Sequence, residues 1–266
     1  GWKTNMLLNS SCEGIGWYSP EFISRTLFLV KKLKSAGLSG ATLTNPIYVQ
    51  KIKKEVPALN ITASVICEID SVQSALFFEE LGADAFVPDR DINRNLDLLK
   101  EIKEATDMEM ILMLNEGCLF KCPQRIFHYN FISHWSRIEK EKHIDFPTNY
   151  CIALRGQRPE ELLKMQFILP QHLKHYRKIT SSFKIVGRKK DTPEILRITE
   201  AYLEENFKGN LLDIMSSATP EIKERYGFNI PAKFLDDKFF RKVTSCSKNC
   251  TKCNYCKQLV NKLLNS

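Results

Sequence analysis

Short apolar runs alternate with amphipathic stretches through most of the chain. The apolar runs have the length of single strands, whereas the amphipathic stretches repeat their apolar residues at helical spacing. The predicted strands cover residues 6–9, 40–46, 61–66, 85–88, 110–114, 167–170 and 183–188. The predicted helices cover residues 20–34, 47–54, 71–81, 92–106, 123–139, 171–178 and 193–204. An irregular insertion is expected over residues 145–160.

Seven strand-helix units in strict alternation predict an α/β fold with a parallel sheet and helices outside it. A closed barrel and a doubly wound sheet both meet this description. The first predicted strand is not followed by Gly-x-Gly-x-x-Gly, which disfavours a dinucleotide-binding sheet. We therefore expect a TIM-like (β/α) barrel. Because such a barrel has eight strands, a first strand is expected upstream of Gly1.

The strand-helix pattern fades after Tyr202 and gives way to a mixed segment with turns at Gly209 and Pro231. A compact group of cysteines and a short predicted helix, 257–264, follow it. This change predicts two parts. Residues 1–205 form the barrel and carry the catalytic site, and residues 206–266 form a small C-terminal extension with a cysteine-rich, metal-binding tail.

The chain of 266 residues is basic, with a formal charge of +8. This charge suits an anionic partner such as RNA, but the lysines are scattered over predicted helices, as is typical of solvated faces. A small-molecule substrate and an RNA substrate therefore both stay open, and no protein partner is indicated. No apolar run approaches the roughly 18 residues of a membrane span, and residues 1–11 do not resemble a signal peptide. We expect a cytoplasmic protein that does not enter a membrane.

Nine cysteines are unusually many for such a chain. Disulfides are disfavoured because no secretion signal is visible and the chain is long enough to bury a sizeable core. The cysteines fall into groups, which points to a metal held by thiolates, either as an iron-sulfur cluster or as zinc.

The tail has the form C-x3-C-x2-C-x2-C, made by Cys246, Cys250, Cys253 and Cys256. Zinc sites usually pair two cysteine arms across a longer loop, whereas closely spaced cysteines are usual around iron-sulfur cubes. We therefore expect a 4Fe-4S cluster here, with zinc as the alternative.

A second group lies in the turn after the strand 110–114, where Cys118 and Cys122 stand between an apolar run and a helix. The carboxyl ends of parallel strands are where ligands bind in α/β folds. Together with Cys151, these cysteines are interpreted as a shared metal site, and buried unpaired thiols are the alternative. Cys118 as a nucleophile with His128 as its base is a further alternative, although no oxyanion hole is recognisable.

Four residues near the predicted rim are candidates for catalysis or substrate binding. Asn115 ends its strand, Arg125 and His128 would share one face of the following helix, and Arg188 ends the seventh strand. Arg188 could clamp a carboxylate or phosphate, or it could form a rim salt bridge with Asp89 or Glu68. His128 could equally be an ordinary helix-surface residue.

The chain resembles the peptidase U32 family, also called collagenase-like peptidases. Several motifs carry this resemblance in the order of the family: Leu81–Asp84, Asn115–Leu119 with Cys122–Pro123, His128-x-Asn130, Ile168-x-Pro170, Phe183–Arg188 and Ala201–Tyr202. The likeness extends to about Asp213.

The resemblance implies a barrel-like catalytic domain. Some members are described as proteases, whereas better understood relatives bind a 4Fe-4S cluster through four cysteines and support oxygen-independent hydroxylation of RNA or quinone precursors. Cys118, Cys122 and Cys151 match such a cluster, but the usual fourth cysteine has no counterpart in 167–176. Cys12, Cys67, the tail or a non-cysteine group would have to replace it.

The leading interpretation is an iron-sulfur enzyme with one or two 4Fe-4S clusters, acting as a hydroxylase or related redox enzyme. Two alternatives remain. One is a peptidase with structural cysteines, and the other is a non-catalytic scaffold that binds RNA or protein.

Overall fold

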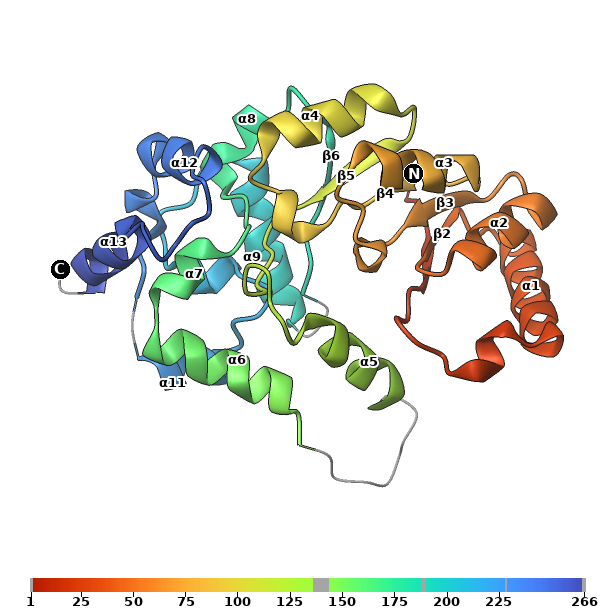
Figure 1. Cartoon of the computed structure of the whole chain (residues 1–266), viewed down its shortest axis with the longest axis horizontal. Helices are drawn as coiled ribbons and strands as arrows, with labels where there is room; N and C mark the ends of the chain where they lie inside the picture. The colour runs from red at the N-terminus through yellow and green to blue at the C-terminus, as the bar shows by residue number, and fades with distance from the viewer. Residues whose placement is uncertain (1, 136–143, 188–189, 228, 265–266) are drawn as a thin grey trace. The chain divides into compact units, whose positions relative to one another are not determined.

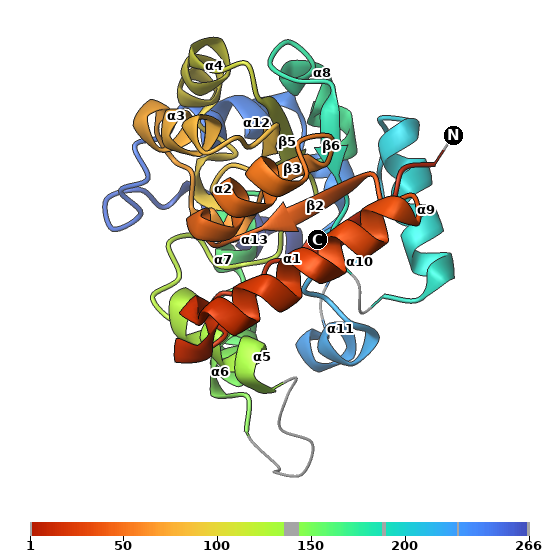
Figure 2. The same ribbon diagram turned by 90° about the vertical axis from the view of Figure 1, so that its right-hand side faces the viewer.

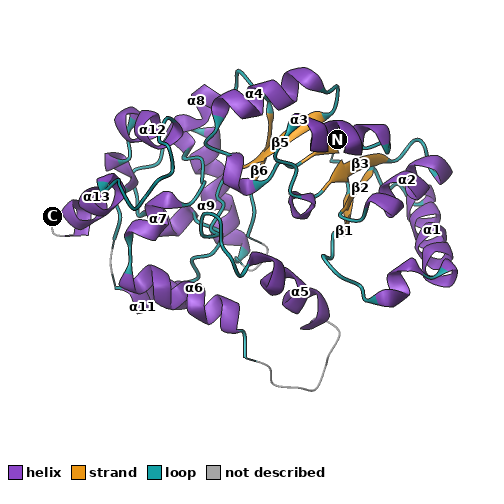
Figure 3. Cartoon of the chain, viewed as in Figure 1, coloured by secondary structure: helices purple, strands orange, loops and turns teal. Residues whose placement is uncertain are grey.

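The computed structural model describes residues 2–135, 144–187, 190–227 and 229–264. Strands and helices alternate along the chain (Figures 1 and 3). The strands are β1 (Asn5–Leu8), β2 (Gly40–Leu43), β3 (Asn60–Ala63), β4 (Ala85–Phe86), β5 (Glu109–Met113) and β6 (Ser182–Lys184). They form one sheet in the order β1-β2-β3-β4-β5-β6, and β1 through β5 pair in parallel. This confirms a TIM-like α/β arrangement.

The α-helices are α1 (Pro20–Ser35), α2 (Pro46–Glu55), α3 (Val72–Glu80), α4 (Leu96–Ala105), α5 (Arg125–Trp135), α6 (Phe146–Gln157), α7 (Glu160–Lys164), α8 (Leu173–Tyr176), α9 (Thr192–Leu203), α10 (Leu211–Ile214), α11 (Pro220–Tyr226), α12 (Asp237–Thr244) and α13 (Tyr255–Leu264). Short 3-10 turns are η1 (Ile15–Tyr18), η2 (Val65–Cys67), η3 (Arg90–Ile92), η4 (Pro170–His172) and η5 (Ala232–Phe234). No helix in the described residues is long and apolar enough to cross a membrane.

The chain divides into two compact units. The first unit contains Gly1–Asp89, Lys100–Ile111 and Pro123–Ile144, and the second contains Arg90–Leu99, Leu112–Cys122 and Asp145–Ser266. The predicted boundary after residue 205 stays a prediction.

In the first unit, the short strands are bordered by helices whose starts are marked in the sequence. Ser19 caps α1 and Asn45 caps α2, and each is followed by a proline in the first turn. Helix α2 packs against α1, β2 and β3 (Figure 2). A β-carbon on Gly40 would lie 2.9 Å from the carbonyl oxygen of Asn60, so β2 and β3 can approach closely only because this residue is glycine.

In the second unit, a buried arginine organises the core. Arg94 donates to the carbonyl oxygens of Leu163 at 2.8 Å and Phe167 at 3.3 Å, and its guanidinium lies 4.4 Å from the centre of the Phe167 ring. The Tyr202 hydroxyl donates to the Ile168 carbonyl at 2.8 Å. These side chains thus donate to backbone carbonyl oxygens that, in a β-strand, would accept from the neighbouring strand.

These bonds explain why one predicted strand is wrong. Residues 167–170 are buried and apolar, but they are not a strand, and Pro170 already begins η4. Ile168 N donates to the carbonyl oxygen of Leu114, the residue after β5, at 2.7 Å. The described residues therefore contain six strands rather than seven, because an apolar run indicates burial but does not by itself indicate strand pairing.

The predicted irregular insertion is also wrong, because residues 146–157 form helix α6. Asp145 caps this helix by accepting from Thr148 N at 2.9 Å, and Pro147 lies in its first turn. These are ordinary helix-start signals, which could have identified α6 from the sequence. The predicted end of the helix 123–139 lies outside the described residues.

Candidate functional site

The turn after β5 is fixed by Asn115. Its side-chain amide donates to the carbonyl oxygens of Val186 at 2.7 Å and Ile214 at 3.0 Å, and its Oδ1 accepts from Val186 N at 2.8 Å. The side chain is 1% exposed. All of these bonds go to backbone groups, so the geometry favours a positioning role for Asn115 in the predicted site.

Cys118 lies in a buried group of charged side chains at this turn. Arg90, which follows β4, donates from Nη1 to Cys118 Sγ at 3.2 Å. The same Nη1 is 3.6 Å from Glu116 Oε1, and that oxygen accepts from Cys118 N at 2.8 Å. Arg90 and Glu116 are 6% and 5% exposed. A guanidinium beside sulfur stabilises the thiolate, which is the form of cysteine that binds metals and attacks electrophiles.

Arg155 connects Cys151 on α6 to the same turn. Its Nε donates to Cys151 O at 3.1 Å, and its Nη1 donates to Ser217 Oγ at 2.7 Å and to Gly117 O at 3.3 Å. Burial raises the pKa of Cys151, Arg155 lowers it, and the nearby Cys122 thiol raises it. The structure thus brings Cys151 to the cysteine turn, despite the long separation in sequence.

We call Cys118, Cys122 and Cys151 the central cysteines. In the structure as it stands, no three His, Cys, Asp or Glu side chains of the described residues are placed to hold a metal ion. The donor chemistry still fits a thiolate-bound group, because the thiols stand beside the two buried arginines.

Two other candidates, Arg125 and His128, lie on α5 in the first unit. Arg125 is buried, with Nη1 3.9 Å from Asp89 Oδ1. His128 is half-buried. Helix α5 is also held by the loop after β1, since Ser11 Oγ donates to Asn130 Oδ1 at 2.8 Å. Arg188 lies outside the described residues.

We call Cys246, Cys250, Cys253 and Cys256 the tail cysteines. All four line one cavity of about 450 Å³ in the second unit. Cys246 follows α12 and Cys256 lies in α13, whereas Cys250 and Cys253 are exposed on the loop between these helices. Lys164, Lys242 and Lys248 line the same cavity. Burial raises the pKa of Cys256 to about 11, although Arg94 opposes this shift.

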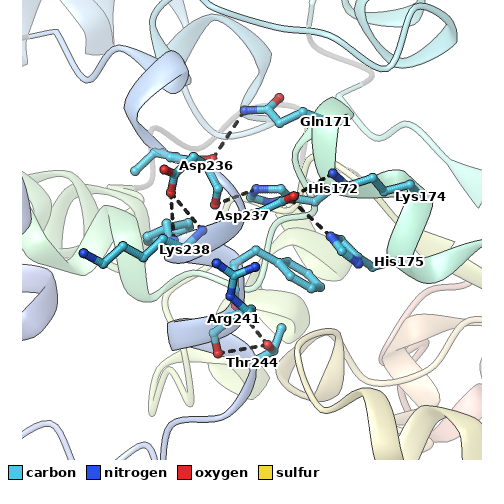
Figure 4. A network of polar contacts seen from close by, with 12 residues as sticks. Gln171, His172, Lys174, His175, Asp236, Asp237, Lys238, Arg241 and Thr244 are labelled. Carbon is cyan, nitrogen blue, oxygen red and sulfur yellow. Dashed lines mark hydrogen bonds and ion pairs between the residues drawn. The ribbon is translucent and has the colours of Figure 1, made fainter.

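A polar network docks the helix that leads into the tail (Figure 4). His172 Nε2 donates to Asp236 O at 3.2 Å, which requires the Nε2-protonated tautomer. His175 Nε2 and Lys174 Nζ bind the Asp237 carboxylate at 3.2 and 2.7 Å. The His175 ring stacks on Phe240 at 4.2 Å. These contacts hold α12 against η4 and α8, and thereby place Cys246 at the cavity.

The profile of peptidase family U32 matches residues 18–122. The chain is also 35% identical over 262 residues to the uncharacterized protease MJ1657 of Methanocaldococcus jannaschii, covering 98% of this chain and 77% of that protein. The chain belongs to peptidase family U32. This confirms the resemblance seen in the sequence.

Among solved structures, the U32 peptidase Mk0906 matches with a TM-score of 0.47 and 26% identity over 53% of this U32 chain and 57% of that chain. A dihydrodipicolinate synthase from Aquifex aeolicus matches with a TM-score of 0.36 and 12% identity, covering 94% of this chain and 85% of that one.

The U32 profile includes the turn with Cys118 and Cys122, but it ends before Cys151 and the tail. The sequence did not reveal the two arginines that hold the central cysteines. Arg155 stands four residues after Cys151, a helical spacing that could have pointed to it once α6 was recognised. Arg90 carried no signal beyond its place after a strand.

Proposed function

We propose that this U32 protein is an iron-sulfur redox enzyme whose central cysteines are thiolate ligands. The observation that carries the proposal is the contact of Arg90 Nη1 with Cys118 Sγ at 3.2 Å in a buried setting. Three thiolates repel one another and resist burial, so a protein that uses them together needs cations close by. Arg90 and Arg155 supply those cations, and Cys122 and Cys151 interact electrostatically.

The chain's own residues have separate tasks in this proposal. Arg90 and Arg155 offset the charge of the thiolates and fix the geometry of the turn. Asn115 holds the turn to the segments after β6 and in α10. A cluster bound by three cysteines would have one iron without a cysteine ligand, and would supply Lewis-acid or redox chemistry there. The roles of Arg125, His128 and Arg188 in substrate binding stay predictions.

The proposed substrate is an oxygen-bearing small molecule or an RNA. The U32 resemblance and the charge of +8 support this proposal. If RNA is the substrate, its binding weakens steeply as salt is raised, because phosphate contacts release counterions.

The test is the iron and sulfide content of the chain purified without oxygen, with its absorption spectrum. Cys118→Ala should remove about four irons per chain, the content of one cluster. The wild-type chain, purified in the same way, is the control. If Cys118→Ala binds as much iron as the wild-type chain, the proposal is wrong.

A second candidate, a thiol-dependent peptidase, is favoured by the same Arg90 contact and by the name of the Methanocaldococcus relative, a protease. In this case Cys118 is the nucleophile and the arginine stabilises its thiolate. Such an enzyme would cleave peptides after iron is chelated and would lose that activity in Cys118→Ala. Peptide cleavage that survives this substitution would exclude Cys118 as the nucleophile.

A further inference from the structure

We propose that the tail cysteines bind a 4Fe-4S cluster in the cavity that they line. This site uses no residue of the central cysteine site, so it goes beyond the function proposed above and does not depend on it. The U32 profile ends at residue 122, well before the tail.

The fold supports this assignment by bringing all four thiols to one cavity. The end of α12 delivers Cys246, the start of α13 delivers Cys256, and the loop between them carries Cys250 and Cys253. Helix α13 packs against α7, which contributes Lys164 to the wall of the cavity. The cysteines are free thiols, and none is used in a disulfide.

The cavity has room for a cluster. The tail cysteines line a space of about 450 Å³. An iron-sulfur cube contains eight atoms inside its ring of cysteine sulfurs, and it uses closely spaced cysteines of this kind.

The charges around the cavity also suit a cluster with four thiolate ligands, which is anionic. The thiols of Cys246 and Cys256 interact electrostatically with buried Arg94 and with Lys248, and Lys164 interacts with Cys250 and Cys256. Lys164 also pairs with Glu161 at 2.6 Å, and Glu160 lines the cavity. Cations therefore outnumber carboxylates around the thiols.

The conformation of the loop places the positive charge of Lys248 beside the tail cysteines. This residue has a φ of 61°, in the left-handed region that non-glycine residues rarely adopt. Its Nζ donates to Val243 O at 2.6 Å, so the side chain folds back over the end of α12. The loop thus keeps a lysine against the cavity beside Cys246 at some conformational cost.

The experiment uses the full chain, reconstituted without oxygen with ferrous iron and sulfide. The variant is the double substitution Cys250→Ala and Cys253→Ala, because both side chains are exposed and their removal leaves the core intact. The matched control is Ser247→Ala, which lines the same cavity but offers no thiolate. Iron, sulfide and zinc per chain are measured, with circular dichroism and the low-temperature EPR spectrum after reduction.

We expect the double variant to lose about four irons and four sulfides relative to the control, with unchanged circular dichroism. Cys118→Ala, measured in parallel, separates the two proposals. If the tail variant loses its iron but Cys118→Ala loses none, the tail cluster stands and the central cluster fails. Equal iron in the tail variant and Ser247→Ala, zinc in place of iron, or no iron uptake by the wild-type chain would each overturn the tail assignment.

Discussion

The central and tail cysteines represent two ways of gathering thiols in one chain. The central cysteines come from a turn and from a helix far along the sequence, and two buried arginines join them. The tail cysteines stand within one short segment, and two of them are exposed. The central group therefore depends on tertiary structure, whereas the tail cysteines are already close together in the sequence.

This difference predicts different responses to perturbation. A change that loosens the tertiary contacts should move the central thiols apart. The tail thiols should stay near one another, because they are close in the sequence. Cysteines that stand close together in the sequence can bind metal even in the unfolded chain. Substitutions that act on one group of cysteines at a time therefore separate the two.

The largest expected effect comes from Arg155→Ala. It removes a buried guanidinium that donates to Cys151 O, Gly117 O and Ser217 Oγ. We expect the free energy of unfolding to fall by about 3 kcal/mol, as for other losses of a buried polar network. Central iron should be lost while tail iron stays. Urea unfolding and iron content measure this, with exposed Arg158→Ala as the control.

A smaller effect on stability is expected when the pH is lowered, because His172 helps to hold α12 in place. Burial lowers the pKa of His172 from 6.5 to about 4. Between these values the unfolded chain binds a proton at this residue and the folded chain does not. The contribution of His172 to stability is therefore fully present above pH 6.5 and is lost as the pH falls towards 4, by about 1–3 kcal/mol.

The measurement is the free energy of unfolding against pH for the wild-type chain and His172→Gln. Glutamine keeps a side-chain donor for Asp236 O but does not titrate, so the difference between the two chains should change between pH 6.5 and 4. Arg94, Asp237 and His175 also act on His172 and are present in both proteins. If the difference stays constant over this range, His172 does not contribute to the loss of stability in acid.

The sequence predicted those features that depend on local pattern. The spacing of the tail cysteines, the alternation of strands and helices, and the motifs around Asn115 all lie within short segments. The sequence failed where distant residues decide the outcome. Residues 167–170 have the hydrophobicity of a strand, but Arg94 and Tyr202 take their backbone carbonyls. Arginine is usually a surface residue, so the burial of Arg90 and Arg155 could not be predicted from the sequence pattern alone.

The smallest effect tests the tail alone. Lys248 interacts electrostatically with Cys246 and Cys256, so Lys248→Gln removes a positive charge from the edge of the proposed cluster. Reduction adds negative charge to the cluster, and a nearby cation stabilises that state. We expect the reduction potential to fall by about 40 mV, which corresponds to about 1 kcal/mol for one electron at a partly solvated site.

A redox titration followed by EPR measures this shift, with Lys252→Gln as the matched control. Lys252 is exposed on the same loop but does not line the cavity. Equal potentials in the two variants would place Lys248 outside the electrostatic reach of the cluster. A fall confined to Lys248→Gln, together with an unchanged central site, would show that the two groups of cysteines are tuned by separate cations: buried arginines at the centre and a folded-back lysine in the tail.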